Sequence, residues 1–194
     1  MEAQKLHIQF ITGNPHKFEE VQQRLIEEKL EVELSWLNID TLEIQAESIE
    51  EVAVFKLKNI QKRTTSSYFV EDSGFFVDIP LNGFPGVYSS YVHKTLGNEG
   101  MLKLIGDHKQ SKAHFETVIA FYYEPEVQIY TFHGRVDGKV SSQIRGSYGF
   151  GYDPIFIPEQ RPEKTFAELT TREKNELSHR GKALDQFIAF LRNL

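Results

Sequence analysis

The sequence predicts an α/β fold in which a mixed central β-sheet is flanked by helices. Two observations support this class. In the first third of the chain, apolar strand segments precede helices with apolar stripes, and near the middle two alternating segments are separated by a short turn. The first pattern is typical of parallel strands and the second of an antiparallel hairpin. With 194 residues and no repeat, low-complexity tract or linker, the chain fits a single domain over residues 1–194, with room for two lobes that share one sheet.

The first strand, over residues 6–12, passes through a small polar turn directly into a helix. Asn14 is a good helix N-cap, and Pro15 suits the first helical position. Because the free N–H groups and dipole of a helix N-terminus attract anions, the turn predicts a phosphate site, to which Lys17 adds a full positive charge. Taken alone, the segment is explained more readily by an ordinary capped junction. The predicted apolar stripe of this helix comprises Phe18, Val21, Leu25 and Ile26.

A second strand is predicted over residues 32–39, and a second helix follows a capping box formed by Ser48 and Glu51. The buried face of this helix is predicted to comprise Ile49, Val52, Ala53, Leu57 and Ile60. Lys56 lies on the same face. A lysine in such a position either extends its ammonium to the rim of the apolar surface or reaches into a cleft to meet an anion, and the pattern leaves both alternatives open.

An apolar strand region over residues 68–79 is expected to be broken at Glu71–Gly74. Asp72 would then lie where a strand ends, a common place for a functional site. A carboxylate there can bind Mg²⁺ or take a proton from water, although an ordinary turn carboxylate is an equal alternative. Glu71 points the opposite way along the strand, so only one of the two carboxylates is expected to enter the site.

The middle of the chain predicts a loop over residues 81–85, a short helix around residues 101–105 and then the hairpin. The hairpin strands are expected over residues 114–123 and 127–136, with an extension over residues 138–144. These segments are expected to build a second lobe.

A glycine-rich segment, Phe150–Pro154, precedes a short apolar strand. Glycines at 146, 149 and 151 would let the backbone approach a flat ligand, an aromatic ring could stack on a base, and Asp153 could bind polar atoms on the base edge. Taken alone, the segment is explained more readily as a loop closed by core aromatics.

The last helix is predicted to begin after an N-cap at Ser178, with Lys174 just before it. Its apolar face is expected to comprise Leu177, Leu184, Phe187, Ile188 and Leu191. His179 and Arg180 would occupy its first turn, where cations oppose the helix dipole unless an anion or acid is near. A surface charge cluster is the simpler explanation of this segment alone. Two helix N-termini with cations in place of acids nevertheless favour a shared anionic ligand.

The composition excludes several functional classes. A net charge of −6 argues against a partner with a nucleic-acid backbone. The chain has no apolar run near the roughly 18 residues of a membrane span and no signal-peptide core at its start, which predicts a cytoplasmic protein without a membrane partner. It has no cysteine, and its seven histidines lack metal-ligand spacing. Any metal is therefore expected to have oxygen ligands.

Four motifs in their order make the chain similar to the inosine triphosphate pyrophosphatase family. They are Thr12-Gly13-Asn14, Glu71-Asp72-Ser73-Gly74, Phe150-Gly151-Tyr152-Asp153-Pro154 and Ser178-His179-Arg180, and the resemblance spans residues 8–190. It implies an elongated two-lobed α/β homodimer, with a mixed central sheet and an active-site cleft between the lobes. It also implies Mg²⁺ as cofactor and a small-molecule purine nucleoside triphosphate as partner.

The resemblance assigns roles to individual residues. It implies triphosphate binding by the first motif and Lys17, with Lys56 also reaching the phosphates. Asp72 matches the acid that activates water, Ser73 lies next to substrate, and Glu43 is the best match to a second metal ligand, with Glu47 as a rival.

The remaining matches concern the base and its neighbouring phosphates. The resemblance implies a base pocket formed by Phe150, Gly151, Tyr152 and Asp153. Further phosphate and base contacts are implied for Lys174, His179 and Arg180.

These assignments predict hydrolysis of the bond between the α and β phosphates of deaminated purine nucleotides such as ITP, dITP and XTP. Asp72 acts as base, metal ligand or both. The alternative is a regulatory module that binds a purine nucleotide without cleaving it. A phosphotransferase ranks last, because the chain has no GxxxxGK loop.

Overall fold

The computed structural model describes residues 5–106 and 108–194. Residues 1–4, part of the start at which the sequence predicts no signal-peptide core, lie outside this range. Two compact units divide the chain, and each is described by itself. Unit 1 comprises the chain up to Asp72 together with Val118–His133 and Ala183–Leu194, and unit 2 comprises Ser73–Thr117 and Gly134–Lys182. Among the described residues, no helix has the length and apolar character needed to cross a bilayer.

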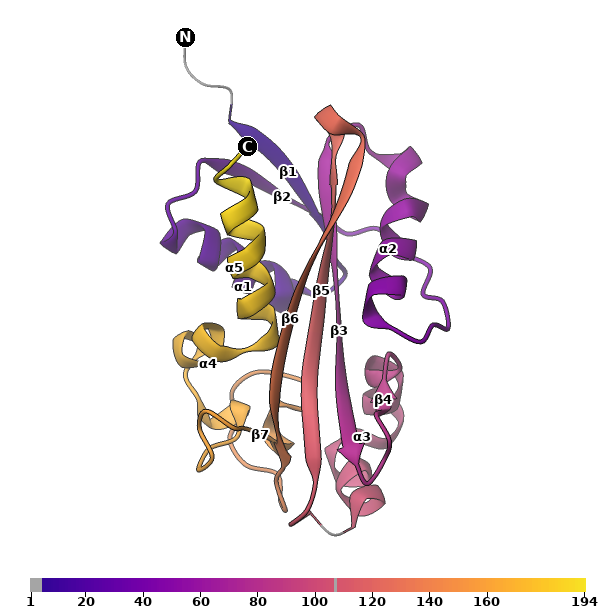
Figure 1. The fold of residues 1–194 in the computed structure, drawn as a ribbon, viewed down its shortest axis with the longest axis vertical. Coiled ribbons are helices and arrows are strands. Elements are labelled where there is room, and N and C mark those ends of the chain that lie inside the picture. The colour runs from indigo at the N-terminus through magenta and orange to yellow at the C-terminus, as the bar shows by residue number, and fades with distance from the viewer. Residues whose placement is uncertain (1–4, 107) are drawn as a thin grey trace. The chain divides into compact units, whose positions relative to one another are not determined.

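Seven strands form a single sheet in the described part of the chain (Figure 1). In chain order the strands are β1 (Leu6–Ile11), β2 (Val32–Leu37), β3 (Ser67–Ile79), β4 (Phe84–Gly86), β5 (Lys112–Tyr123), β6 (Gln128–Val140) and β7 (Phe156–Pro158). Their order in the sheet is β2-β1-β3-β5-β6-β7, and β4 pairs with β3. β1 is parallel to β2 and β3, whereas β4 and β7 are antiparallel to their partners. The predicted mixed α/β sheet is therefore confirmed.

The helices and turns connect these strands in an alternating order. The α-helices are α1 (Pro15–Glu27), α2 (Ile49–Ile60), α3 (Ser89–Ile105), α4 (Thr171–Leu177) and α5 (His179–Leu191). Short 3-10 turns are η1 (Gln61–Arg63), η2 (Glu124–Glu126), η3 (Asp153–Ile155) and η4 (Phe166–Glu168). The turn η2 joins β5 to β6, which confirms the predicted hairpin.

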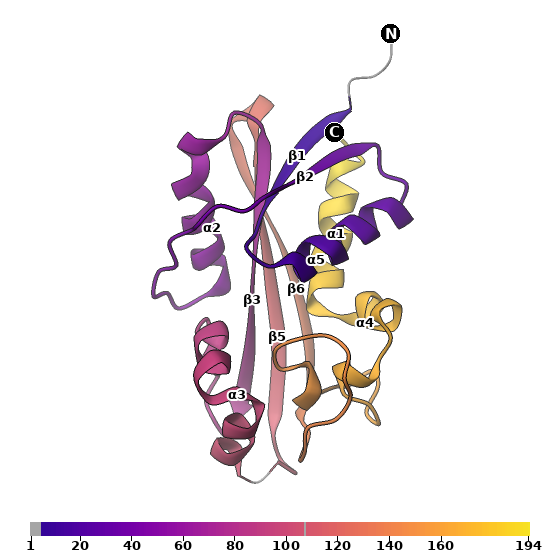
Figure 2. The ribbon, with the colours of Figure 1, turned by 180° about the vertical axis from the view of Figure 1, so that it is seen from behind.

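Unit 1 packs helices on both faces of its strands, with α1 and α5 on one face and α2 on the other (Figures 1 and 2). Alternation along β3 explains the two layers. Phe69 stacks on Phe10 with ring centroids 4.3 Å apart, in the core shared with α1 and α5. The next residue toward the N-terminus, Tyr68, faces α2 and donates a hydrogen bond to the carbonyl of Leu57. Each residue of β3 therefore has a predictable face.

Unit 2 has its own aromatic core. Phe75 of β3 stacks on Tyr152 at 4.7 Å, and Phe115 of β5 contacts Phe156 and Phe166. These residues are buried. The core therefore fixes both the end of β3 and the segment around Tyr152.

Four sequence-based expectations about elements are wrong. The predicted loop over residues 81–85 includes the start of β4, because Phe84 and Pro85 pair with β3. β3 continues through Glu71–Gly74 instead of breaking there, because the strand ladder uses peptide groups, so Asp72 lies in mid-strand and not at a strand end. α3 begins at Ser89, well before the predicted short helix, and residues 89–100 escaped prediction because they lack an apolar stripe. The hairpin extension ends at Val140, because the Ser141 side chain hydrogen-bonds the backbone of Gln143 and turns the chain.

Two apolar residues differ from the predicted helix faces. Ile26 is 70% exposed, because it lies at the edge of the stripe formed by Val21 and Leu25. Leu177 ends α4 rather than belonging to the last helix, since Ser178 separates the two helices in extended conformation.

Candidate active site

The turn after β1 has the predicted N-cap. Asn14 accepts a hydrogen bond from the His16 N–H at 3.0 Å through its side-chain oxygen, and Pro15 begins α1. The Thr12 hydroxyl accepts from the Asn14 N–H at 3.1 Å. Gly13 between them is exposed. These two side-chain hydrogen bonds therefore order the backbone of the turn at the start of α1.

Lys17, in the first turn of α1, reaches back to β3. Its Nζ donates to the carbonyl of Glu71 at 3.2 Å and lies 3.3 Å from the Glu71 carboxylate. The Glu71 side chain is completely buried. The sequence predicts that only one of Glu71 and Asp72 enters the site, and this stays a prediction, while each of the two carboxylates pairs with its own lysine. The adjacent carboxylates in the motif were the available signal, and Glu71 contributes by holding Lys17.

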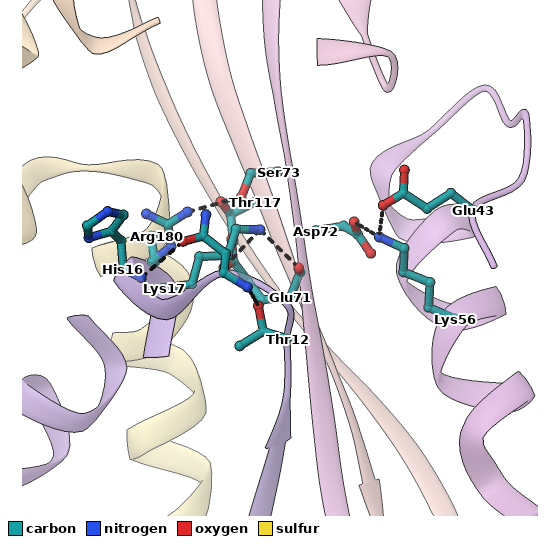
Figure 3. Close-up of polar contacts among 11 residues, drawn as sticks. Thr12, His16, Lys17, Glu43, Lys56, Glu71, Asp72, Ser73, Thr117 and Arg180 are labelled. Carbon is teal, nitrogen blue, oxygen red and sulfur yellow. Dashed lines mark hydrogen bonds and ion pairs between the residues drawn. The ribbon is translucent and has the colours of Figure 1, made fainter. Parts of the chain in front are cut away.

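On the opposite side of β3, Lys56 joins two further carboxylates (Figure 3). Its Nζ donates to Glu43 at 2.7 Å and to Asp72 at 2.5 Å. Lys56 is 8% exposed, so of the two alternatives for this residue the structure has the ammonium turned inward. Glu43 and Glu47 are both exposed, and Glu43 is the one whose carboxylate contacts this ammonium. The predicted opposite orientations of Glu71 and Asp72 are confirmed.

Burial and charge shift the acid–base properties of this pair. Burial is the largest influence on the pKa of Asp72 and raises it, while the charges of Lys56 and Lys17 oppose the rise only in part. Burial also lowers the pKa of Lys56, but Asp72 and Glu43 outweigh that effect and leave it raised. Lys56 therefore stays charged, and Asp72 is a stronger proton acceptor than an ordinary aspartate.

The donor set in unit 1 fits a hard divalent cation. On one face of β3 Lys17 pairs with Glu71, and on the other face Lys56 lies between Glu43 and Asp72, so the group around Lys56 has one carboxylate in excess before any phosphate binds. The buried Oδ2 atom of Asp72 has no hydrogen-bond partner among the described residues, a state that water or an ion usually resolves. No group of three or more His, Asp or Glu ligands occurs in the described chain. Mg²⁺ commonly uses one or two carboxylates with substrate phosphates and water, so two carboxylates are sufficient.

In unit 2, Asp153 organises a cationic aromatic platform. It is buried and accepts hydrogen bonds from the Phe150 N–H at 2.9 Å and from the Lys174 Nζ at 2.8 Å. Lys174 lies over the Phe150 ring at 5.0 Å, and the Arg180 guanidinium lies over it at 5.4 Å. A Cβ on Gly149, whose φ is +74°, would lie 2.1 Å from the Asp153 carboxylate, so this position requires glycine.

Arg180 also contacts Ser73. Its Nη2 donates to the Ser73 hydroxyl at 3.4 Å, and Thr117 donates to the same oxygen at 3.0 Å. Thr117 was not predicted, because a threonine within a strand pattern carries no signal of a site. His179 is buried, and its ring stacks on Phe115 at 4.6 Å.

The other two residues predicted for a base pocket have structural contacts. Tyr152 is buried, and its hydroxyl donates to the carbonyl of Ser89 at 3.1 Å. Burial raises its pKa. The carbonyl of Gly151 accepts from the Asn98 side chain at 3.0 Å, a contact that sequence reasoning missed because Asn98 lies in the unpredicted part of α3. Tyr152 therefore supports the platform through the core.

The predicted N-cap of the last helix is also present, since the Ser178 hydroxyl accepts from the Gly181 N–H at 3.1 Å. A Cβ on Gly181 would lie 1.8 Å from the carbonyl of Asn175, so α4 and α5 can approach this closely only with glycine there. The structure thus brings most of the predicted residues, with Glu71 and Thr117 added, into two clusters, which are named for the roles that the resemblance implies. The clusters do not include Gly13, Gly151, Tyr152 and His179. The phosphate cluster in unit 1 comprises Thr12, Asn14, Lys17, Glu43, Lys56, Glu71 and Asp72. The base cluster in unit 2 comprises Ser73, Thr117, Phe150, Asp153, Lys174 and Arg180.

Known proteins resemble this chain over nearly its whole length. The dITP/XTP pyrophosphatase of Thermococcus kodakarensis is 50% identical over 187 residues, which cover 96% of this chain and 98% of that protein. The dITP/XTP pyrophosphatase of Pyrococcus horikoshii is 46% identical over 96% of this chain and 97% of its own. The solved structure of a HAM1 protein from Coxiella burnetii, 30% identical, has a TM-score of 0.83 and covers 97% of this chain and 100% of that chain. The model of the Ham1 family matches residues 8–190, and the chain belongs to that family.

Proposed function

We propose that this protein is a nucleoside triphosphate pyrophosphohydrolase that cleaves the α–β phosphoanhydride of deaminated purine nucleotides. The products are a nucleoside monophosphate and pyrophosphate. Relatives named dITP/XTP pyrophosphatase align over nearly the full chain and support the reaction class. The observation that carries the proposal is the buried Lys56, whose ammonium contacts both Asp72 and Glu43. The Oδ2 atom of Asp72 has no hydrogen-bond partner among the described residues and can bind a metal ion or water.

The phosphate cluster takes the triphosphate. A triphosphate brings about four negative charges, so the excess of carboxylates in this cluster would repel it unless a divalent cation bound as well. Glu43 and Asp72 would hold Mg²⁺, which supplies charge neutralisation and aligns the phosphates when bound. Lys17, Lys56 and the N-terminus of α1 add positive charge on the protein's side.

Asp72 orients the attacking water and removes its proton. The water oxygen forms a new bond to phosphorus, the α–β anhydride bond breaks, and the proton passes to Asp72. Burial raises the pKa of Asp72, so in the metal-free site this carboxylate binds a proton more readily than an ordinary aspartate does. Lys56 restrains Asp72 in one orientation through their 2.5 Å contact.

The base cluster takes the purine. The Phe150 ring provides a stacking surface, worth about 1 to 3 kcal/mol per base, and Asp153 fixes its backbone. Lys174 and Arg180 supply donors next to that ring. A 6-oxo group accepts from such donors, whereas the amino group of adenine would face them as a second donor. This arrangement favours hypoxanthine and xanthine over adenine.

One assay separates the proposal from its alternatives. Pyrophosphate and orthophosphate release from ITP are measured with and without Mg²⁺. The proposal expects pyrophosphate only, and only with the metal. A regulatory nucleotide-binding module would bind ITP and release neither product, and a phosphotransferase would need an acceptor. Release of orthophosphate as the first product would contradict the proposal.

Base selection is tested by comparing kcat/KM for ITP, XTP, GTP and ATP. We expect ITP and XTP to exceed ATP by at least tenfold, because a buried donor left facing another donor is costly. Equal values for all four nucleotides would remove the assigned role of the base cluster. The proposal also includes a cytoplasmic location, a homodimer and no nucleic-acid partner, and these stay predictions.

A further inference from the structure

Trp36 is the only tryptophan in the chain, and it contacts the turn of the phosphate cluster. It lies on β2 opposite Phe10 of β1 in the parallel register. Its indole Nε1 donates a hydrogen bond of 2.7 Å to the carbonyl of Thr12. Its ring stacks on Phe18, in the second turn of α1, with centroids 5.4 Å apart and planes 18° from parallel. One side chain thus touches both the start of the turn and the helix that follows it.

The contact at Thr12 fixes one peptide plane. The Thr12 N–H already donates to the carbonyl of Leu37 at 3.3 Å, so both the N–H and the C=O of Thr12 are hydrogen-bonded to β2. The peptide between Thr12 and Gly13 is trans, and in a trans peptide the C=O and N–H bonds point in opposite directions. Holding the Thr12 carbonyl against the indole therefore directs the Gly13 N–H away from β2. Donation to that carbonyl also polarises the peptide and strengthens the Gly13 N–H as a donor.

Packing alone does not account for this arrangement. Trp36 is 44% exposed, so its ring is not a core side chain, and phenylalanine would preserve the stack on Phe18. A phenylalanine has no N–H, so it could not donate the hydrogen bond that the indole makes to the carbonyl of Thr12. This hydrogen bond is therefore the contact that requires tryptophan.

We infer that Trp36 is a positioning residue for the nucleotide, which aims the Gly13 N–H at a substrate phosphate by fixing the Thr12–Gly13 peptide. This inference rests on the proposed function of the turn as a phosphate site. Because the coupling is reciprocal, a phosphate that accepts from Gly13 also strengthens the hydrogen bond between Trp36 and Thr12. Nucleotide binding should therefore be visible at the indole itself.

The first test observes the single indole N–H resonance of the wild-type protein by NMR. The probe is an inosine triphosphate in which a methylene group replaces the α–β bridging oxygen, added with Mg²⁺ to saturation as established by calorimetry. A downfield shift of the indole proton is expected, because its hydrogen bond strengthens. An unchanged resonance in the saturated protein would overturn the inference, and this result needs no variant.

The second test compares two variants that each lose one aromatic donor and keep a ring. Trp36→Phe removes the bond to Thr12, and the control Tyr130→Phe removes the bond from Tyr130 to Glu126 at the turn η2 of the same unit. For Trp36→Phe we expect KM for ITP to rise about three- to tenfold, with kcat within twofold, as for a contact made equally in ground and transition states. The control should match the wild type.

The two hypotheses fail in different ways. If wild-type protein releases no pyrophosphate from any purine triphosphate, the proposed function fails. If the wild type is active and Trp36→Phe has an unchanged KM, or changes kcat alone, the inference about Trp36 fails while the function stands. Melting temperatures of both variants verify that they are folded, and the NMR measurement decides the question if Trp36→Phe is not.

Discussion

At the scale of single residues, the chemistry depends on buried charges that hold one another in place. Asp72 and Glu71 are neighbours on β3, and each pairs with a lysine from a different helix on a different face. Breaking a buried pair by removing one partner leaves an uncompensated charge, which is expensive, so these lysines are fixed before any substrate arrives. A pre-organised cationic site aligns phosphates without reorganisation during the reaction.

The role of Asp72 as base predicts the effect of its removal. Asp72→Asn retains the shape of the side chain but cannot take a proton, so we expect kcat for ITP to fall by about 10² to 10⁴. The control is Asp78→Asn on the same face of β3, where the carboxylate pairs with His114 at 2.8 Å in unit 2. Steady-state kinetics and circular dichroism measure both variants. Near-normal turnover in folded Asp72→Asn would remove this residue from the mechanism.

The choice of Glu43 over Glu47 as metal ligand predicts a difference in metal requirement. In Glu43→Gln the concentration of Mg²⁺ that gives half-maximal rate should rise by on the order of tenfold, because one charged ligand is lost. Glu47→Gln is the matched control, since that side chain is exposed and lies in the same loop. A Mg²⁺ titration of activity measures both. An increase in Glu47→Gln alone would reverse the assignment.

At the scale of elements, capping decides where the functional segments begin. Three helices begin at an N-cap that was predicted from its residue type: Asn14, Ser48 and Ser178. Each of these side chains accepts a hydrogen bond from a backbone N–H in the first turn of its helix. Side-chain periodicity located α1, α2 and α5 because these helices bury a stripe. It missed most of α3, which is interrupted at Gly97 with φ of +65°.

The capping box at η4 predicts a pH-dependent stability. Glu168 accepts a hydrogen bond from the Thr165 N–H at 2.8 Å, and this bond, with the charge of Arg145, holds the pKa of Glu168 below the ordinary value of a glutamate. A lowered carboxyl pKa stabilises the folded state above the unfolded value, and that contribution disappears as pH falls through the folded value.

The corresponding variant is Glu168→Gln, in which the cap loses its charge. This variant should melt at a lower temperature than the wild type at pH 7. The loss in the free energy of unfolding should be only about a few tenths of a kcal/mol, because Glu168 is accessible to solvent. The difference should shrink as pH falls below the ordinary pKa of a glutamate. Glu176→Gln, which alters an exposed pair with Arg172 on α4, is the control. A difference that persists unchanged at pH 3 would contradict the linkage.

At the scale of the whole molecule, the class of fold and the motifs of the candidate site could be identified from the sequence. The side-chain contacts of several residues in that site could not. Lys56 was identified as anomalous because charge interrupts an apolar stripe, and the structure supplies its partners. Thr117 and Asn98 could not be identified, because a hydroxyl or amide within a strand or helix looks the same whether it meets a ligand, a side chain or water. The resemblance implied Tyr152 as part of the base pocket, and the structure buries this side chain against Phe75 in the core of unit 2.

The central claim is that water attacks the α–β anhydride of a purine triphosphate. It is tested most directly by running a complete turnover of ITP with Mg²⁺ in ¹⁸O-labelled water and following the products by ³¹P NMR. The account predicts equimolar inosine monophosphate and pyrophosphate, with one ¹⁸O atom in one of the two products. Orthophosphate as a primary product, or products without the label, would contradict it.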